Sequence, residues 1–183
     1  MPDICPWWAG YLIANPLRRL VQDPAKILSP YVKPAMTVVE PGPGIGYFTL
    51  ELARLVGPAG RVVAVDIQAR MLDSLRRRAR RAGVAGHIDA RVVQPGSLGL
   101  EDLGGSADFA LAFAMVHEFR DDERFFAQVA AALKPGGTVL LAEPAGHVGP
   151  SRWGGELESA VRAGLTVAER PSIWHSHAAL LRK

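Results

Sequence analysis

Three glycines at alternate positions, Gly42, Gly44 and Gly46, separate a short apolar run from an amphipathic stretch. The apolar run, 36–40, has the length of a buried strand, and the stretch 47–56 has the apolar spacing of a helix. Glycine permits a sharp turn between them and lets a ligand approach the main chain without an intervening Cβ. The free N–H groups at the start of the helix would face that ligand. Taken alone, such a loop is equally consistent with a simple turn.

The rest of the chain alternates between β-rich runs and amphipathic stretches, which is typical of parallel strands connected by helices. Strands are expected at 36–40, 61–66, 90–93, 108–114, 138–143, 165–170 and 175–181, and helices at 47–56, 69–82, 121–133 and 152–163. The last two strands are too close in sequence for a helical crossover, so they are expected to pair antiparallel. The pattern predicts a doubly wound α/β domain.

Size and composition agree with one globular domain, because 49% of the 183 residues are hydrophobic and 21% are charged. The longest uninterrupted apolar run, 109–116, is far shorter than the roughly 20 residues of a membrane span, and no secretory signal is recognised. Cys5 is the only cysteine, which excludes disulfide scaffolds and favours a cytoplasmic location. The net charge of +3 permits an acidic partner without requiring one.

An acidic residue ends the second expected strand, since Asp66 lies 20 residues after Gly46. A carboxylate at this place can accept both hydroxyls of an adenosine ribose. The glycines do not fit a dinucleotide fingerprint, because a G-x-G-x-x-G pattern begun at Gly42 or Gly44 lacks its third glycine. A pyrophosphate needs that glycine for close approach. S-adenosylmethionine (SAM) carries no phosphate and does not.

Several segments, in their order, resemble the class I SAM-dependent methyltransferases. They are the E/D-x-G-x-G-x-G motif at 40–46, the second motif at 63–66, the fourth at 108–118, the turn into strand five at 133–138, and the closing hairpin. The resemblance runs from about residue 35 to the C-terminus. It implies a three-layer Rossmann-like fold with a seven-stranded sheet in the order 3-2-1-4-5-7-6 and strand seven antiparallel. Domain 36–183 would transfer a methyl group from SAM and leave S-adenosylhomocysteine.

The resemblance also implies which residues contact the cofactor. The expected contacts are Glu40, Gly42, Gly44, Gly46, Asp66, Ile67, Gln94 and Ala112. The three glycines would face the methionine part of SAM, and Glu40 would lie near its amino group. Asp66 would hold the ribose hydroxyls, and Ile67 would pack on the adenine face.

The loop after strand three departs from the family pattern. Relatives often have Asp-Ala there, whereas ungapped alignment puts Gln94 and Pro95 at these positions. Gln94 can still accept a hydrogen bond through its amide oxygen, but Pro95 has no N–H to offer the adenine ring. Either the adenine is bound differently or the loop is shifted by a residue or two.

The acceptor side is expected at the ends of the fourth and fifth strands. Methyl transfer from a sulfonium requires positioning of the acceptor, and a base only if the acceptor must lose a proton. His117 is the candidate base or positioning residue, with a loop-capping role equally consistent. Glu143 is expected to point toward the same cleft, and a structural pairing with an arginine is as consistent.

Residues 1–35 form a separate segment ahead of the domain. Asn15-Pro16 and Asp23-Pro24 each combine an N-cap residue with a proline, which predicts two short helices. Trp7, Trp8 and Tyr11 are expected to anchor this segment to the core. A lid over the active site is the alternative for these aromatic side chains.

Two further patterns fit structural roles better than functional ones. His147, His175 and His177 have no third ligand at a supporting spacing, so no metal site is expected. The basic run 76–81 leaves the apolar stripe of its helix clear and has no interleaved aromatic residues. We therefore expect a solvated face there and no nucleic-acid partner.

The function expected from these observations is methyl transfer from SAM to a small molecule such as a quinol, thiol, amine or carboxylate. No membrane association is expected, and a homodimer is left open. Three alternatives stay open as well: an RNA or protein methyltransferase, a non-catalytic SAM-binding regulator, and a nucleotide-binding oxidoreductase.

Overall fold

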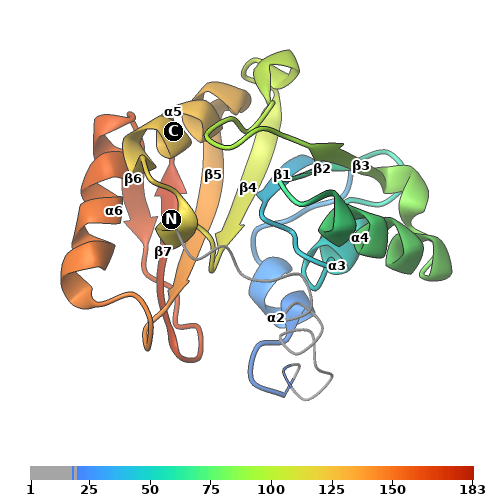
Figure 1. Cartoon of the computed structure of the whole chain (residues 1–183), viewed down its shortest axis with the longest axis horizontal. Helices are drawn as coiled ribbons and strands as arrows, with labels where there is room; N and C mark the ends of the chain where they lie inside the picture. The colour runs from blue at the N-terminus through green and yellow to red at the C-terminus, as the bar shows by residue number, and fades with distance from the viewer. Residues whose placement is uncertain (1–17, 19) are drawn as a thin grey trace. The chain divides into compact units, whose positions relative to one another are not determined.

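The computed structural model describes Arg18 and residues 20–183 (Figure 1). The strands are β1 (Thr37–Pro41), β2 (Arg61–Asp66), β3 (Ile88–Val92), β4 (Ala107–Phe113), β5 (Leu133–Pro144), β6 (Thr166–Glu169) and β7 (Ser176–Arg182). The α-helices are α2 (Pro24–Leu28), α3 (Thr49–Val56), α4 (Ala69–Arg81), α5 (Asp122–Ala132) and α6 (Pro150–Arg162). The strand order is β3-β2-β1-β4-β5-β7-β6, which confirms the predicted Rossmann-like sheet.

The chain divides into two compact units, the first ending at Val93 and the second beginning at Gln94. In the N-terminal unit, β2 pairs in parallel with both β1 and β3. The residues 62–65 of β2 are fully buried, as expected for a parallel strand covered on both faces. The α4 residues Leu72 and Leu75 form a buried cluster with Ala64, which confirms the predicted apolar stripe.

In the C-terminal unit, β5 pairs in parallel with β4 and antiparallel with β7, and β7 pairs antiparallel with β6. This confirms the predicted closing hairpin. The α-helices α5 and α6 pack against each other, and α6 also contacts β6 (Figure 1). No helix in the described part of the chain is long and apolar enough to cross a membrane.

The boundaries of β5 and β3 differ from the prediction. The expected turn before β5 is a bulge inside the strand, because the pairing of β4 with β5 shifts from Ala107–Leu133 to Phe109–Thr138. Gly136 supplies the left-handed backbone there, with φ of 79°. The strand β3 begins at Ile88, earlier than expected, because the 3-10 turn Ala85–His87 leads directly into it.

The start of α2 agrees with its sequence signature. Asp23 is the N-cap, its side chain accepts a hydrogen bond from the N–H of Ala25 at 3.1 Å, and Pro24 is the first helical residue. The aromatic residues Trp7, Trp8 and Tyr11, and the helix expected after Asn15, lie outside the described residues.

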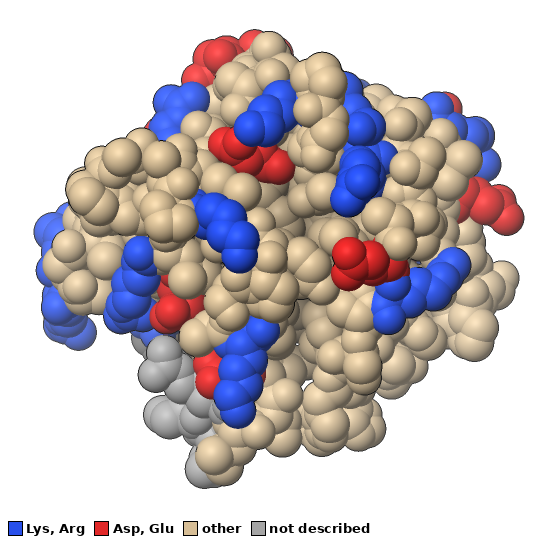
Figure 2. Space-filling view, turned by 180° about the vertical axis from the view of Figure 1, so that it is seen from behind, with Lys and Arg blue, Asp and Glu red and all other residues tan. Residues whose placement is uncertain are grey.

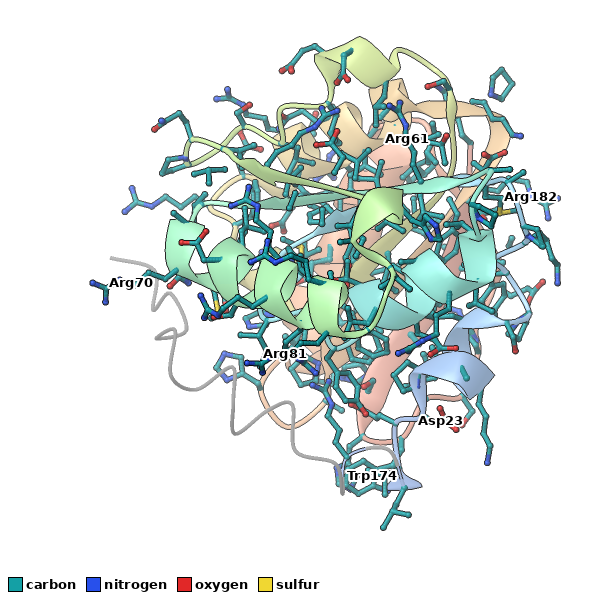
Figure 3. All side chains as sticks on the ribbon, turned by 90° about the vertical axis from the view of Figure 1, so that its right-hand side faces the viewer. Asp23, Arg61, Arg70, Arg81, Trp174 and Arg182 are labelled. Carbon is teal, nitrogen blue, oxygen red and sulfur yellow. The ribbon has the colours of Figure 1, made fainter. Side chains whose placement is uncertain are left out.

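The prediction that the arginine run forms a solvated face is wrong for two of its members. Arg76 and Arg78 are half-buried and donate hydrogen bonds to the backbone carbonyls of Ala90 and Ile45, both at 2.7 Å. Arg81 is exposed, and Arg70, before the run, extends away from α4 in Figure 3. On the face drawn in Figure 2, basic side chains occur in separate groups with carboxylates among them.

Candidate functional site

The glycine loop between β1 and α3 makes the predicted sharp turn, and its three glycines have a left-handed backbone. Gly42, Gly44 and Gly46 have φ values of 65°, 54° and 88°. A Cβ on Gly46 would lie 2.3 Å from the Cδ1 atom of Leu75, whereas a Cβ on Gly44 would meet nothing within 4 Å. Gly46 is therefore required by packing against α4, and Gly44 leaves open space beside the main chain.

Glu40 is a buried carboxylate with an unused acceptor. Its side chain is 4% exposed, and its Oε2 atom has no hydrogen-bond partner among the described residues. Burial raises the pKa of Glu40 to about 8, against an opposing effect of the nearby Thr49 hydroxyl. A buried acceptor of this kind needs a donor, and an ammonium group would supply both hydrogen bonds and the missing positive charge.

Asp66 ends β2 with its carboxylate directed toward the glycine loop. It accepts a hydrogen bond from the N–H of Gln68 at 2.8 Å. Burial raises the pKa of Asp66, and the N–H groups of Gln68, Gly44 and Ile67 reduce that rise. The neighbouring Ile67 side chain is 37% exposed, so an apolar surface lies next to this carboxylate.

In the C-terminal unit, the structure brings His117 and Glu143 together. The Nδ1 atom of His117 lies 2.5 Å from the Oε2 atom of Glu143. The other oxygen of Glu143 accepts hydrogen bonds from the N–H groups of Val116 at 2.7 Å and Met115 at 3.2 Å. The hydrogen bond to Glu143 raises the pKa of His117 in spite of partial burial.

The backbone before His117 is bent in an unusual way. Ala114 has a φ of 54°, in the left-handed region that residues other than glycine seldom adopt, and its N–H donates to the carbonyl of Ala142 at 2.7 Å. The chain then enters the 3-10 turn Val116–Glu118, which carries His117. Directly after this bend, the two successive N–H groups of Met115 and Val116 face Glu143.

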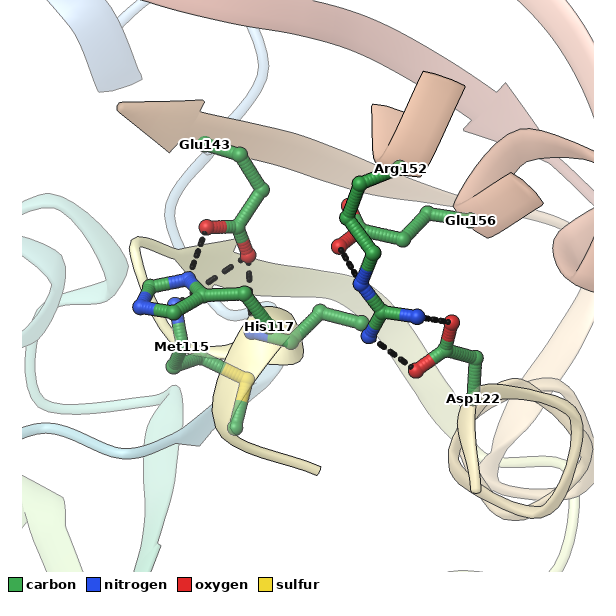
Figure 4. Close-up of polar contacts among 7 residues, drawn as sticks. Met115, His117, Asp122, Glu143, Arg152 and Glu156 are labelled. Atoms are coloured by element: carbon green, nitrogen blue, oxygen red, sulfur yellow. Dashed lines mark hydrogen bonds and ion pairs between the residues drawn. The ribbon is translucent and has the colours of Figure 1, made fainter. Parts of the chain in front are cut away.

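A second set of charges lies beside this pair, as Figure 4 shows. The guanidinium of Arg152 donates two hydrogen bonds to Asp122, at 2.6 and 2.7 Å, and its Nε atom lies 3.3 Å from Oε1 of Glu156. Glu156 is fully buried, and neither of its oxygens makes a hydrogen bond within the described part of the chain. Burial raises the pKa of Glu156 to about 7, and the charge of Glu143 adds to the rise.

Contacts between aromatic rings also occur in the C-terminal unit. The ring of His147 meets that of His117 edge-on, with centroids 4.9 Å apart. The indole of Trp153 stacks on His177 at 5.6 Å. No group of three or more His, Cys, Asp or Glu side chains that could hold a metal ion occurs in residue 18 or in 20–183.

Residues 38–137 match a family model described as "Methyltransferase domain", which covers more than half of the chain. This chain belongs to the class I SAM-dependent methyltransferases. The cofactor that the family and the fold imply is SAM. The residues of the N-terminal unit fit it, because Glu40 offers an unpaired buried acceptor, Gly44 leaves open space, and Ile67 offers an exposed apolar side chain.

Relatives with named activities act on different acceptors. The methyltransferase is 38% identical over 149 residues to the ribosomal protein L11 methyltransferase of Pelotomaculum thermopropionicum, covering 79% of this chain and 43% of the relative. It is 30% identical over 112 residues to the ubiquinone/menaquinone biosynthesis C-methyltransferase UbiE of Pasteurella multocida, covering 61% of this chain and 41% of the relative. The chain thus spans about two fifths of the length of these curated relatives.

The crystal structure of a SAM-dependent methyltransferase from Aquifex aeolicus superposes with a TM-score of 0.85, covering 98% of each chain at 19% identity. At this identity the superposition shows that the two chains share a fold. It does not extend to the acceptor.

All of the expected cofactor contacts stay predictions in this methyltransferase, and two of them, Gln94 and Ala112, lie in surroundings that differ from those of the glycine loop. Gln94 is exposed, and its carbonyl accepts a hydrogen bond from the N–H of Ser97 at 3.0 Å in a turn whose third residue, Gly96, has a φ of 82°. Proline is favoured at the second position of such a turn, which accounts for Pro95. Ala112 is buried within β4, where it pairs with Leu141 of β5.

Sequence reasoning missed Glu156, Arg152 and Asp122. One signal for Glu156 is present in the sequence: it lies on the same helical face as Trp153 and Ala160, which are both buried. A carboxylate on an apolar helix face is uncommon and usually has a specific role. Its ion pair with Arg152 of the same helix follows the spacing i, i+4.

Proposed function

We propose that this methyltransferase methylates a small-molecule acceptor that loses a proton during the reaction, and that His117 removes this proton. The observation that carries the proposal is the short contact between His117 and Glu143, in which the carboxylate is itself held by two backbone N–H groups. Such a base with a fixed orienting partner is the arrangement that general-base catalysis requires.

In the N-terminal unit, Glu40 would pair with the amino group of SAM, and Gly44 would let the methionine part approach the backbone. Asp66 would accept the ribose hydroxyls, and Ile67 would pack on the adenine. When bound, SAM supplies an electrophilic methyl group. The residues around it need only hold it in one orientation, because in-line displacement depends on alignment.

In the C-terminal unit, Glu143 accepts a hydrogen bond from the Nδ1–H group and thereby determines the tautomer of neutral His117. The Nε2 atom then carries the lone pair and can take a proton from an O–H, N–H or S–H group of the acceptor. Because Glu143 raises the pKa of His117, the imidazolium that forms is stabilised.

The test is a turnover assay in which S-adenosylhomocysteine is measured after incubation with SAM and a quinol, a thiol, an amine or a carboxylic acid. With the acceptor that reacts, His117→Ala is expected to lower turnover by about 10²- to 10⁴-fold and to leave S-adenosylhomocysteine affinity unchanged. His87→Ala is the matched control, since His87 contacts the backbone carbonyl of Ala53 in the N-terminal unit. Equal turnover in wild type and His117→Ala would rule out the role of His117.

A protein acceptor is the second candidate, favoured by the 38% identity to the ribosomal protein L11 methyltransferase. Incubation of the methyltransferase with radiolabelled SAM and purified ribosomal proteins distinguishes the two candidates. Label in a protein band, with no turnover on any small acceptor, would favour the second. Binding of SAM without turnover on either class would favour a regulator that only binds SAM.

For residues 1–35 we propose an anchoring role, with a lid as the alternative. The guanidinium of Arg18 lies 4.6 Å from the ring centroid of Tyr47, and the Tyr47 hydroxyl donates to the carbonyl of Gln22 at 2.8 Å. These contacts bind Arg18 and Gln22, which follow the aromatic residues in the chain, to Tyr47. Deletion of residues 1–12 separates the roles: an anchor predicts a large loss of thermal stability, and a lid predicts lost turnover with normal melting.

A further inference from the structure

One arginine of the basic run on α4 reaches the glycine loop. The Nη1 atom of Arg78 donates a hydrogen bond to the backbone carbonyl of Ile45 at 2.7 Å, between residues 33 positions apart in the chain. Ile45 lies between Gly44 and Gly46, and it is buried. The contact therefore holds the middle of the loop that the proposed function places against SAM.

The same helix also limits the loop by packing. Leu75 lies one turn before Arg78 on α4, and its Cδ1 atom lies only 2.3 Å from the position that a Cβ on Gly46 would take. Leu75 is fully buried, and it contributes an apolar contact, whereas Arg78 contributes a hydrogen bond with a permanent positive charge. Two side chains of one face of α4 thus define where Ile45 and Gly46 lie.

The glycines of the loop make the contacts with Arg78 and Leu75 necessary for its order. Three residues between 42 and 46 have positive φ, and glycine loses more conformational freedom on ordering than any other residue. A loop of this composition binds a ligand well only if other parts of the protein order it beforehand, because otherwise binding must supply that ordering. A fixed donor on the Ile45 carbonyl reduces the number of conformations available before SAM arrives.

We infer that Arg78 is a positioning residue for the glycine loop. Arg78 sets the conformation of this loop through Ile45 and does not touch SAM. The inference rests on the proposed function, in that it requires SAM to bind at the glycine loop. It assigns to one residue of the basic run a role in cofactor affinity, in place of a solvated surface or a nucleic-acid contact.

Arg76 provides a matched control on the same helix. Its Nη2 atom donates to the backbone carbonyl of Ala90, also at 2.7 Å, and Ala90 lies in β3 instead of the glycine loop. Both arginines are half-buried and both hold a main-chain carbonyl of the N-terminal unit. Arg76 also pairs with Asp73 through its Nη1 atom at 3.1 Å, so the control variant removes this surface ion pair together with the bond to β3.

The experiment measures S-adenosylhomocysteine binding by isothermal titration and thermal unfolding without ligand, for wild type, Arg78→Met, Arg78→Lys and Arg76→Met. We expect the dissociation constant to rise about tenfold in Arg78→Met, as for loss of one charge-assisted hydrogen bond, and to rise less in Arg78→Lys. Arg76→Met should lower the melting temperature and bind with wild-type affinity. Hydrogen exchange of the amides of residues 42–48 should be faster in Arg78→Met only.

Wild-type affinity in Arg78→Met, or an equal loss in Arg76→Met, would overturn the inference. If Arg78→Met does not fold, Arg78→Lys decides. Reduced affinity with a wild-type melting temperature supports the role, and unchanged affinity overturns it. A wild-type protein that binds no S-adenosylhomocysteine would contradict the proposed function and this inference together. Binding by wild type with no effect of Arg78→Met contradicts the inference alone.

Discussion

The Oε2 atom of Glu143, which is fully buried, lies 2.5 Å from the Nδ1 atom of His117. The partner oxygen of the same carboxylate accepts two backbone N–H groups, from Met115 and Val116. A carboxylate held at both oxygens cannot turn away from the imidazole, so the orientation of His117 is determined by the main chain that surrounds Glu143.

Glu143→Gln tests this orientation. The glutamine oxygen can still accept from the backbone N–H groups, but its NH₂ group would then donate to Nδ1 and place the imidazole proton on Nε2. Turnover should fall at least about a hundredfold, with S-adenosylhomocysteine affinity unchanged. The control is Glu158→Gln, an exposed carboxylate on α6. Full turnover in Glu143→Gln would show that the tautomer of His117 has no part in the reaction.

The pH dependence of turnover should report the state of His117. Its pKa is raised above the ordinary value of about 6.5, and a base acts only when neutral. At saturating SAM, kcat/KM for the acceptor should therefore rise with pH through a midpoint above 6.5 and then level. A steady-state pH profile measures this midpoint, and a rate that is independent of pH between 6 and 9 would contradict the role.

Glu40→Gln should remove the pH dependence of stability that Glu40 causes, and it should weaken cofactor binding. The pKa of Glu40 is about 8 in the folded protein and about 4.3 in the unfolded chain, so the folded state binds more protons between these values. Stability without ligand should therefore fall as pH rises from about 4 to 8, and Glu40→Gln should remove this slope. Urea unfolding at several pH values measures it.

The same variant should bind S-adenosylhomocysteine more weakly, because a neutral amide is a poorer partner for an ammonium group than a carboxylate. In wild type the affinity should increase as pH approaches 8, since more of Glu40 is then already ionised. Glu51→Gln, on the exposed ion pair with Arg54, is the matched control. Equal affinity in Glu40→Gln and wild type would contradict the assignment of Glu40 to the amino group of SAM.

Ala114 offers a test of backbone strain beside His117 and Glu143. Glycine at a φ of 54° relieves about 1 kcal/mol of strain, part of which is offset by the greater freedom of glycine in the unfolded chain. Ala114→Gly should raise the free energy of unfolding by about 0.5 kcal/mol, and Ala114→Val should lower it by about 1–2 kcal/mol. Denaturant unfolding compares them, and a stabilising valine would show that the bend carries no strain.

Local patterns in the sequence determined much of this protein. Glycine spacing predicted a sharp turn after β1, and the structure forms it with positive φ, which only glycine adopts without penalty. The β-rich run 61–66 predicted that Asp66 ends β2, and the short connection before β7 predicted antiparallel pairing. Each of these depends on residues close in the chain or on a motif with a fixed geometry.

The tertiary structure alone decided the contacts between distant residues. Arg78 reaches Ile45 across 33 positions, and Glu143 reaches His117 across 26. The sequence pattern showed that Arg78 lies off the apolar stripe of α4, but whether an arginine at that edge meets solvent or a carbonyl depends on how neighbouring segments pack. Helix periodicity describes one helix and contains no information about the chain that packs against it.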